Sequence, residues 1–278
     1  MKHRLPSGDE GGLCYPPRLR EGSLSRVIAV ANQKGGVGKT TTAINLAASL
    51  AAAERRVLAV DIDPQGNLTS GFGRKTREPR PSFYEVLIEQ KPLEEVLIPT
   101  DLDHLTLAPS DRNLTGAEVE LVPLLAREYR LKEALVPVAS RFDYVFIDCP
   151  PSLGLLTVNA LAAAQTVLIP LQCEYFALEG ISELTSTMRR VQRALNPELD
   201  LEGVLLTMVD ERMNLTQQVR SDIREHFKDK VFATAIPRSV RLAEAPSFGK
   251  PIIHYDRYSA GASAYEVLAG EVAKRLKI

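Results

Sequence analysis

The sequence has few cysteines, no tryptophan and no long apolar run. Only three cysteines occur among 278 residues, and none has the CxxC spacing of a zinc or redox site. This scarcity argues against a disulfide framework and favours a reducing cytoplasm as the compartment. Residues 1–25 contain no apolar stretch long enough for a signal peptide or a membrane span. They are rich in glycine and proline, and we expect a flexible leader there.

An excess of charge of either sign is also lacking. Lys and Arg number 34 against 35 Asp and Glu, which gives a net charge of −1. A protein that binds nucleic acid over its whole surface is usually basic, so any DNA contact must come from a local patch, for example one assembled on dimerisation. The composition, with 45% hydrophobic and 25% charged residues, is that of an ordinary globular protein. We assign residues 26–278 to one large α/β domain.

A strand, a glycine-rich loop and a helix follow one another near the start of this domain. The apolar run at 27–31 predicts a buried strand, and the Ala/Leu-rich run at 41–53 predicts a helix. Between them stands KGGVGKT, residues 34–40. Glycines lack a Cβ, so this backbone can wrap closely around an anion that also faces the positive end of the helix. We expect a phosphate-binding loop formed by Gly35, Gly36, Val37, Gly38 and Thr41 together with Lys34, Lys39 and Thr40.

The residue types at the end of the loop suit nucleotide chemistry. Lys39 would reach the β- and γ-phosphates, and the hydroxyl of Thr40 would ligate Mg²⁺. The usual GxxxxGK[ST] pattern has a glycine where this chain has Gln33, and a second cation, Lys34, follows it. The alternative is a glycine-rich turn with two solvated lysines. The carboxylates described in the next paragraph argue against this alternative.

Three carboxylates follow apolar strands. The run at 57–60 predicts a strand that delivers Asp61 and Asp63 to its carboxyl end, and the run at 144–147 predicts one that ends at Asp148. Carboxylates at this edge of an open α/β sheet can hold Mg²⁺ through water or orient an attacking water. An isolated DxD often caps a helix, so the inference depends on the order of these signals after the loop. We predict Thr40, Asp61 and Asp148 as the metal-site residues.

The remainder of the chain alternates between predicted strands and helices. Strands are expected at 105–108, 166–170, 204–209 and 231–236, and helices at 118–136 with a break at Pro123, 178–195, 219–227 and 262–278. Residues 72–100, with short amphipathic pieces such as 83–88, are expected to form surface structure between strands. The alternation predicts a single doubly wound, mostly parallel sheet flanked by helices.

The motifs resemble the ParA/MinD family of P-loop ATPases, whose deviant Walker A loop matches KGGVGKT. From residue 26 onward the chain is similar to the ParA/Soj branch. That similarity includes DIDPQGN at 61–67, CEYFALEG at 173–180, LLTMVDER at 205–212 and IPRSVRLAEAPSFGKPIIHYD at 236–256. The resemblance implies the P-loop NTPase fold of the deviant Walker A type. Met213 departs from the threonine that many relatives carry after the arginine.

The resemblance also implies roles for particular residues. Lys34 would reach the phosphates of a partner subunit, and Asp63 would position the water for hydrolysis, so that Lys34, Lys39 and Asp63 form the catalytic set. Pro64 would belong to the nucleotide site, and adenine would lie near Met208 and Pro237. Arginines that match Arg212 and Arg241 carry nonspecific DNA binding in the family, although a solvated surface arginine is the alternative for each.

The implied function is ATP-dependent partition of chromosomal or plasmid DNA. Its cofactors would be ATP or ADP and Mg²⁺, and its partners a second copy of the chain, nonspecific double-stranded DNA and a ParB-type centromere-binding protein. The location would be cytoplasmic and nucleoid-associated, without stable membrane association. Two alternatives are a MinD-like membrane switch, which would add an amphipathic tail, and a metabolic P-loop amide synthase. An iron–sulfur cluster is not expected, because Cys149 directly follows Asp148 in the predicted nucleotide site.

Overall fold

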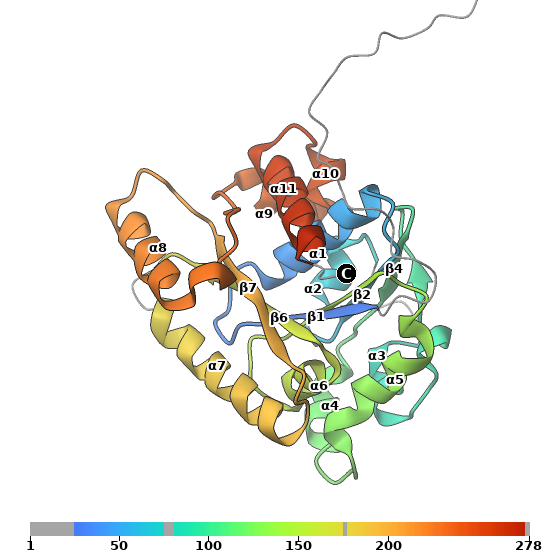
Figure 1. Ribbon diagram of the computed structural model, residues 1–278. Coiled ribbons are helices and arrows are strands. Elements are labelled where there is room, and N and C mark those ends of the chain that lie inside the picture. Colours follow the sequence, from blue (N-terminus) through green and yellow to red (C-terminus); the bar gives the residue numbers. More distant parts are fainter. Residues whose placement is uncertain (1–24, 75–80, 175–176, 276–278) are drawn as a thin grey trace, which may run out of the picture.

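The computed structural model describes residues 25–74, 81–174 and 177–275 (Figure 1). Its centre is a seven-stranded sheet in the order β3-β4-β2-β5-β1-β6-β7. Only the pair β3 and β4 is antiparallel, and every other neighbouring pair is parallel. The predicted doubly wound, mostly parallel sheet is thus confirmed. The strands are β1 (Arg26–Val30), β2 (Val57–Asp61), β3 (Ile98–Pro99), β4 (Leu105–Ala108), β5 (Tyr144–Asp148), β6 (Thr166–Gln172) and β7 (Asp200–Thr207).

Helices cover both faces of the sheet, which appears edge-on in Figure 1. Above it in that view lie α1 (Lys39–Ala52), α2 (Asn67–Gly71), α9 (Val240–Glu244), α10 (Ile252–Tyr255) and α11 (Ala260–Lys274). Below it lie α3 (Phe83–Ile88), α4 (Leu114–Glu120), α5 (Arg130–Ala139), α6 (Leu155–Ala163) and α7 (Ala177–Ala194). The helix α8 (Asn214–Phe227) follows the edge strand β7. Short 3₁₀ turns occur at Leu93–Glu95, Arg127–Tyr129, Lys228–Lys230 and Ala245–Phe248.

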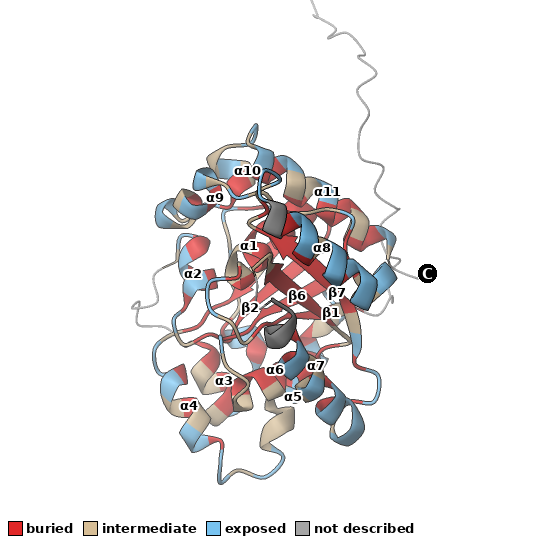
Figure 2. Cartoon of the chain, turned by 90° about the vertical axis from the view of Figure 1, so that its left-hand side faces the viewer, coloured by how far each residue is buried: buried red, intermediate tan, exposed pale blue. Residues whose placement is uncertain are grey.

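Each face of the sheet has its own apolar core, because successive side chains of a strand point to opposite faces. Ile28 of β1 packs into the core between the sheet and helices α1 and α11. Ala29 packs into the core between the sheet and helices α5, α6 and α7. Both residues are fully buried. The strands appear as the continuous red centre of Figure 2. A strand that is buried on both faces reads as a continuous apolar run, as the sequence predicts.

The register of the central strands places the predicted carboxylates at one edge of the sheet. Asp61 at the end of β2 pairs with Asp148 at the end of β5, and Asp148 pairs with Val30 at the end of β1. The loop after β1 therefore begins beside Asp148. Since these strands are parallel, their carboxyl ends form one surface, which is where ligands bind in open α/β sheets.

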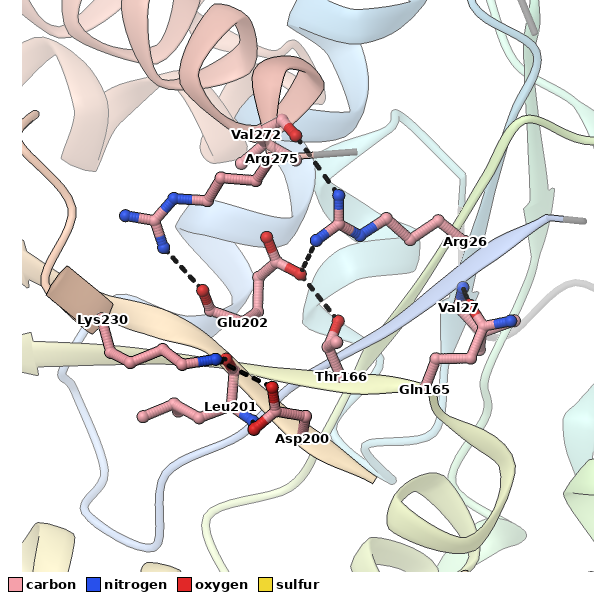
Figure 3. A network of polar contacts seen from close by, with 10 residues as sticks. All are labelled: Arg26, Val27, Gln165, Thr166, Asp200, Leu201, Glu202, Lys230, Val272 and Arg275. Atoms are coloured by element: carbon pink, nitrogen blue, oxygen red, sulfur yellow. Dashed lines mark hydrogen bonds and ion pairs between the residues drawn. The ribbon is translucent and has the colours of Figure 1, made fainter. Parts of the chain in front are cut away.

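A polar network ties the opposite edge of the sheet to the end of α11 (Figure 3). Buried Glu202 forms an ion pair with Arg26, and its Oε2 accepts a hydrogen bond of 2.8 Å from the Thr166 hydroxyl. Arg275 donates to the carbonyl oxygen of Glu202 at 2.6 Å and stacks on the Phe232 ring, 3.9 Å from its centroid. These contacts join the amino-terminal parts of three strands to the last turn of α11, away from the carboxyl-end surface.

The break expected at Pro123 within the helical stretch 118–136 is present, and it is longer than one residue. The chain forms α4 up to Glu120 and α5 from Arg130, with turns between them. Pro123 cannot donate to a helical hydrogen bond, and Ala126 has a left-handed φ of 52°. Residues 72–100 are also more than surface structure, because Phe83, Val86 and Leu87 of α3 lie in the core.

The strand expected at 231–236 is not formed. The segment meets β7 through the isolated Val204–Val231 bridge and through hydrogen bonds from the amides of Phe232 and Ile236 to the carbonyls of Val204 and Leu206, at 3.0 and 2.8 Å. The amides of Ala233 and Thr234 instead donate to the carboxylate of Glu271, at 2.8 and 3.1 Å. The side chain of Glu271 in α11 thus accepts hydrogen bonds from amides that a β-ladder would need. The leader prediction for residues 1–25 lies almost wholly outside the described residues.

Candidate nucleotide site

The glycine-rich loop runs from the end of β1 to the start of α1. Gly36 and Gly38 have φ values of 73° and 88°, a left-handed conformation that favours glycine. Gly38 is the N-cap of α1 and supplies no side-chain cap. The first amides of a helix lack partners within the helix, so an uncapped N-terminus can bind an anion. On the other side of the loop, Thr207 donates from its hydroxyl to the Val37 carbonyl at 2.8 Å and ties the loop to β7.

Lys39 is held inside the site. Its side chain is largely buried, and the ammonium donates to the Lys34 carbonyl at 3.0 Å. Burial lowers the pKa of Lys39, and the negative charge of Asp148 is the largest effect that opposes this. Asp63 acts in the same direction as Asp148. The lysine and the two carboxylates predicted from separate motifs therefore lie close enough to interact electrostatically.

Asp148 has the properties of a residue that meets a cation. It is fully buried, and neither carboxylate oxygen has a hydrogen-bond partner within the described part of the chain. Burial raises its pKa well above the ordinary value, and Asp61 adds to the shift. The Thr40 hydroxyl favours the ionised form but forms no hydrogen bond of ordinary geometry with the carboxylate. A buried carboxylate without partners is costly, and a hydrated Mg²⁺ held beside Thr40 would satisfy both oxygens.

Asp61 is fixed by the turn that follows β2. Its Oδ2 accepts hydrogen bonds from the Thr69 amide at 2.8 Å and the Thr69 hydroxyl at 2.7 Å. Its Oδ1 accepts from the Asp63 amide at 3.2 Å. Burial raises the pKa of Asp61 to about 7, against the effect of Thr69. Asp61 thus holds the loop that carries Asp63, and its metal-shell role stays a prediction.

The Asp63 loop is a tight turn anchored on a neighbouring strand. The Gly66 amide donates to the Asp63 carbonyl at 2.9 Å and closes a turn with Pro64 at its second position. Ser110, just after β4, donates its hydroxyl to the same carbonyl at 2.6 Å. Among the described residues, the Asp63 side chain accepts only from the Gln65 amide, at 2.9 Å. This leaves a carboxylate oxygen of Asp63 for other contacts.

Lys34 is engaged within its own subunit. Its ammonium forms an ion pair with Glu174, just beyond β6, and both side chains are nearly half exposed. The Lys34 amide donates to Asn32 Oδ1 at 3.0 Å, and the Asn32 amide group donates to the Pro170 carbonyl at 2.8 Å. Asn32 was not singled out from the sequence, and Glu174 was named only as part of the motif at 173–180. Lys34 and Glu174 are 140 positions apart in the chain, and Asn32 and Pro170 are 138 apart, so no local pattern could signal these two contacts.

The two residues predicted near adenine line one pocket. Met208 and Pro237 border a cavity of about 190 Å³ together with Gly38 and Thr41 from the loop and Tyr265 from α11. Met208 has a φ of 52°, and the Val209–Pro237 bridge sets the two segments side by side. The cavity thus begins at the phosphate loop and ends in a largely apolar wall, which suits a nucleobase.

Arg212 and Arg241 both lie on the surface, with side chains 89% and 57% exposed. Each is already paired. Arg212 donates two hydrogen bonds to the Asp210 carboxylate, from Nε at 2.8 Å and from Nη2 at 2.6 Å. Arg241 contacts Glu244 at 3.3 Å and Asp256 at 3.5 Å. The structure therefore leaves these arginines outside the nucleotide pocket.

The cysteines do not suggest a metal cluster. Cys149 is fully buried beside Asp148 and Cys173 is half-buried near Arg220, while Cys14 lies outside the described residues. Within the ranges that the structure describes, no helix has both the length and the apolar character needed to cross a membrane.

Sequence comparisons point to one family. A family model described as an AAA domain matches residues 25–201. "Chromosome partitioning protein ParA" of Myxococcus xanthus is 58% identical over 91% of this chain and 89% of its own length. "Sporulation initiation inhibitor protein Soj" of Bacillus subtilis is 54% identical over 90% of this chain and 99% of its own length.

Solved structures share the fold. One described as cobyrinic acid a,c-diamide synthase of Mycobacterium smegmatis with bound ADP and magnesium has a TM-score of 0.78 at 41% identity, covering 88% of this chain and 93% of that one. MinD of Pyrococcus horikoshii with Mg-ADP has a TM-score of 0.73 at 24% identity, covering 90% of this chain and 96% of that one, a likeness of fold alone.

Fold and site together define a P-loop nucleotide-binding protein with a second lysine in its loop. The ADP, the ATP analogue and the magnesium named for two 41% identical solved structures agree with the predicted cofactors, ATP or ADP and Mg²⁺. With relatives more than 50% identical over nearly the whole described domain, the chain belongs to the ParA/Soj family of chromosome-partitioning ATPases.

Proposed function

We propose that this chain is an ATP-dependent switch that partitions chromosomal or plasmid DNA. The observation that carries the proposal is that the phosphate loop with its two lysines lies next to the segments that bear Arg212 and Arg241, on the β7 side of the sheet. Pro237 is bridged to Val209, so the segments that bear Arg212 and Arg241 meet beside the pocket that starts at Gly38. A change at the nucleotide can thus act directly on both.

In this proposal the loop and Lys39 bind the phosphates of ATP. Thr40 and Asp148 would hold Mg²⁺, whose charge would neutralise the phosphates and align them for in-line attack. The buried, unpartnered oxygens of Asp148 support this assignment. Met208 and Pro237 border the adenine, and Pro64 lies in the turn that completes the site on its other side.

Lys34 acts between subunits. Its exposed ammonium sits at the mouth of the loop, where a second copy could approach. ATP-driven closure of two subunits would exchange the Glu174 carboxylate for the partner's phosphates, which carry more charge. Asp63, with a carboxylate oxygen left for other contacts, then orients the attacking water. Hydrolysis is slow, and a ParB-type partner accelerates it.

DNA binding follows from dimerisation. A subunit with a net charge of −1 attracts a polyanion weakly, whereas two subunits present two copies of Arg212 and Arg241 on one assembly. The γ-phosphate orders the loops after β2 and β5, and its loss releases the dimer from DNA. The protein would then act in the cytoplasm on the nucleoid, without stable membrane association.

A DNA-retention assay tests the proposal. Full-length protein is incubated with labelled duplex DNA and Mg²⁺ in the presence of ATP, ADP or no nucleotide. Retention with ATP alone is expected, and Lys39→Ala serves as the control that cannot use ATP. Equal retention with ADP and ATP would contradict the switch.

The solved structures raise a second candidate, an amide synthase, because one 41% identical structure is described as cobyrinic acid a,c-diamide synthase. The ParA and Soj relatives are more similar in sequence, which favours partition. ATP turnover that requires cobyrinic acid and an amide donor would support the synthase instead. A MinD-like switch predicts ATP-dependent flotation with liposomes and no retention of DNA.

A further inference from the structure

The carboxylate of Asp210 occupies the guanidinium fork of Arg212. Arg212 donates to Asp210 from Nε and Nη2, one bond to each carboxylate oxygen, at 2.8 and 2.6 Å. The Arg212 amide donates to the same carboxylate at 3.1 Å. A phosphate uses this fork in the same bidentate way. The arginine predicted to bind DNA therefore holds an internal carboxylate in the position where a phosphate would bind.

A second arginine lies beside the same carboxylate. The Arg238 amide donates to the Val209 carbonyl at 3.1 Å, so the backbone at Arg238 is fixed next to the residue that precedes Asp210. The Arg238 side chain is exposed and takes part in no ion pair among the described residues. Asp210 feels both cations: the hydrogen bond from Arg212 is the main cause that lowers its pKa to about 2, and the charge of Arg238 adds to this. The carboxylate is thus ionised throughout the physiological pH range.

We propose that Arg212 and Arg238 form one phosphate-binding site for the DNA backbone and that Asp210 is an internal competitor that occupies it in the free subunit. The proposal rests on the proposed DNA-binding function and deepens it. Arg238 is the additional cation, and no carboxylate among the described residues is paired with it. Asp210 weakens binding to DNA and so helps to restrict retention to the dimer, where several such sites act together.

Because the Asp210 carboxylate is charged and paired with Arg212, a DNA phosphate has to displace it from the guanidinium. An exposed ion pair is weak, so a DNA phosphate can replace the carboxylate when neighbouring contacts hold the duplex in place. Once displaced, Asp210 remains close to the DNA and repels it. Removal of its charge should therefore tighten binding, and the gain should depend on Arg212.

The experiment measures the affinity of full-length protein for a labelled duplex by fluorescence anisotropy, with ATP and Mg²⁺, over a series of salt concentrations. Asp210→Asn is compared with Asp222→Asn, which removes the same charge from the exposed face of α8. We expect Asp210→Asn to bind roughly two- to fivefold more tightly per subunit, the range of an exposed ion pair. Asp222→Asn should give a smaller gain, because it only reduces the overall negative charge.

Two further variants separate local competition from a general effect. In the Arg212→Ala background, Asp210→Asn should give no more than the gain of Asp222→Asn, because the cation for which it competes is gone. Arg238→Ala should weaken binding and flatten the plot of log affinity against log salt by about 0.9 per subunit. Melting curves of all variants check that each one is folded.

The outcomes distinguish this inference from the function on which it rests. If the wild-type protein binds no DNA with ATP, the proposed function fails and this inference fails with it. If the wild type binds but Asp210→Asn equals Asp222→Asn, or if its gain persists without Arg212, the competitor role alone is wrong. An unchanged salt dependence in Arg238→Ala would remove Arg238 from the site.

Discussion

The ammonium of Lys39 donates a hydrogen bond to the carbonyl oxygen of Lys34, 3.0 Å away. The two lysines of the loop are thus linked through the backbone of one and the side chain of the other. A phosphate would compete with that carbonyl for Lys39, while the Lys34 side chain points to Glu174. The same seven-residue motif therefore holds one lysine inside the loop and leaves the other at the surface.

Lys39→Ala should weaken binding of Mg-ATP by about a hundredfold or more, because it removes the charge-assisted contacts to the β- and γ-phosphates. Isothermal titration with ATP measures this directly. Lys91→Ala, an exchange of a lysine outside the loop, is the control. Undiminished affinity in Lys39→Ala would count against the whole site.

Lys34→Ala should keep nucleotide binding but lose ATP-driven dimerisation and hydrolysis, since the proposed target of Lys34 lies across the interface. Sedimentation with ATP gives the oligomeric state. Glu174→Gln is the matched variant, because it frees Lys34 from its ion pair and should dimerise at least as well as the wild type. A normal ATP dimer of Lys34→Ala would show that the lysine has no role across the interface.

Asp63→Ala should stop hydrolysis while ATP binding stays intact, so that the dimer is trapped. Phosphate release and ATP affinity are measured on the same preparation, with Asp111→Ala as the control. Hydrolysis at the wild-type rate would mean that another group positions the water.

Thr69→Val should destabilise the fold by about 1–3 kcal/mol, because Asp61 Oδ2 would lose the hydroxyl donor at 2.7 Å in a fully buried site. The loss should also raise the pKa of Asp61 further, since the Thr69 hydrogen bonds act to lower it. Urea unfolding measures the stability. Thr69→Ser keeps the hydroxyl and should be less affected; equal losses in both variants would assign the effect to packing.

Much of the fold was predictable because the parallel strands are buried on both faces and read as apolar runs. The strand ends at Asp61 and Asp148 follow from the same runs. The antiparallel β3 was not predictable, since a strand of two residues shows no hydrophobic periodicity. The conformation of 231–236 was not predictable either, since amides of this segment donate to Glu271 of the distant helix α11. The loop residues of the site were identified by motif. Glu174 and Ser110 were not, because their contacts form only when segments distant in sequence meet.

Arg241→Ala should weaken DNA binding and flatten its salt dependence while ATP-driven dimerisation survives. Each phosphate contact on duplex DNA contributes about −0.9 to the slope of log affinity against log salt, so the loss of one contact per subunit should change the slope by roughly 2 per dimer. Arg241 lies 57% exposed and must exchange Glu244 and Asp256 for phosphate, so its net contribution to affinity is modest although its contribution to the slope is full. Arg190→Ala, which removes the same charge from α7, should leave the slope unchanged. If Arg241→Ala and Arg212→Ala both keep the affinity of the wild type, DNA binds to another surface of the protein.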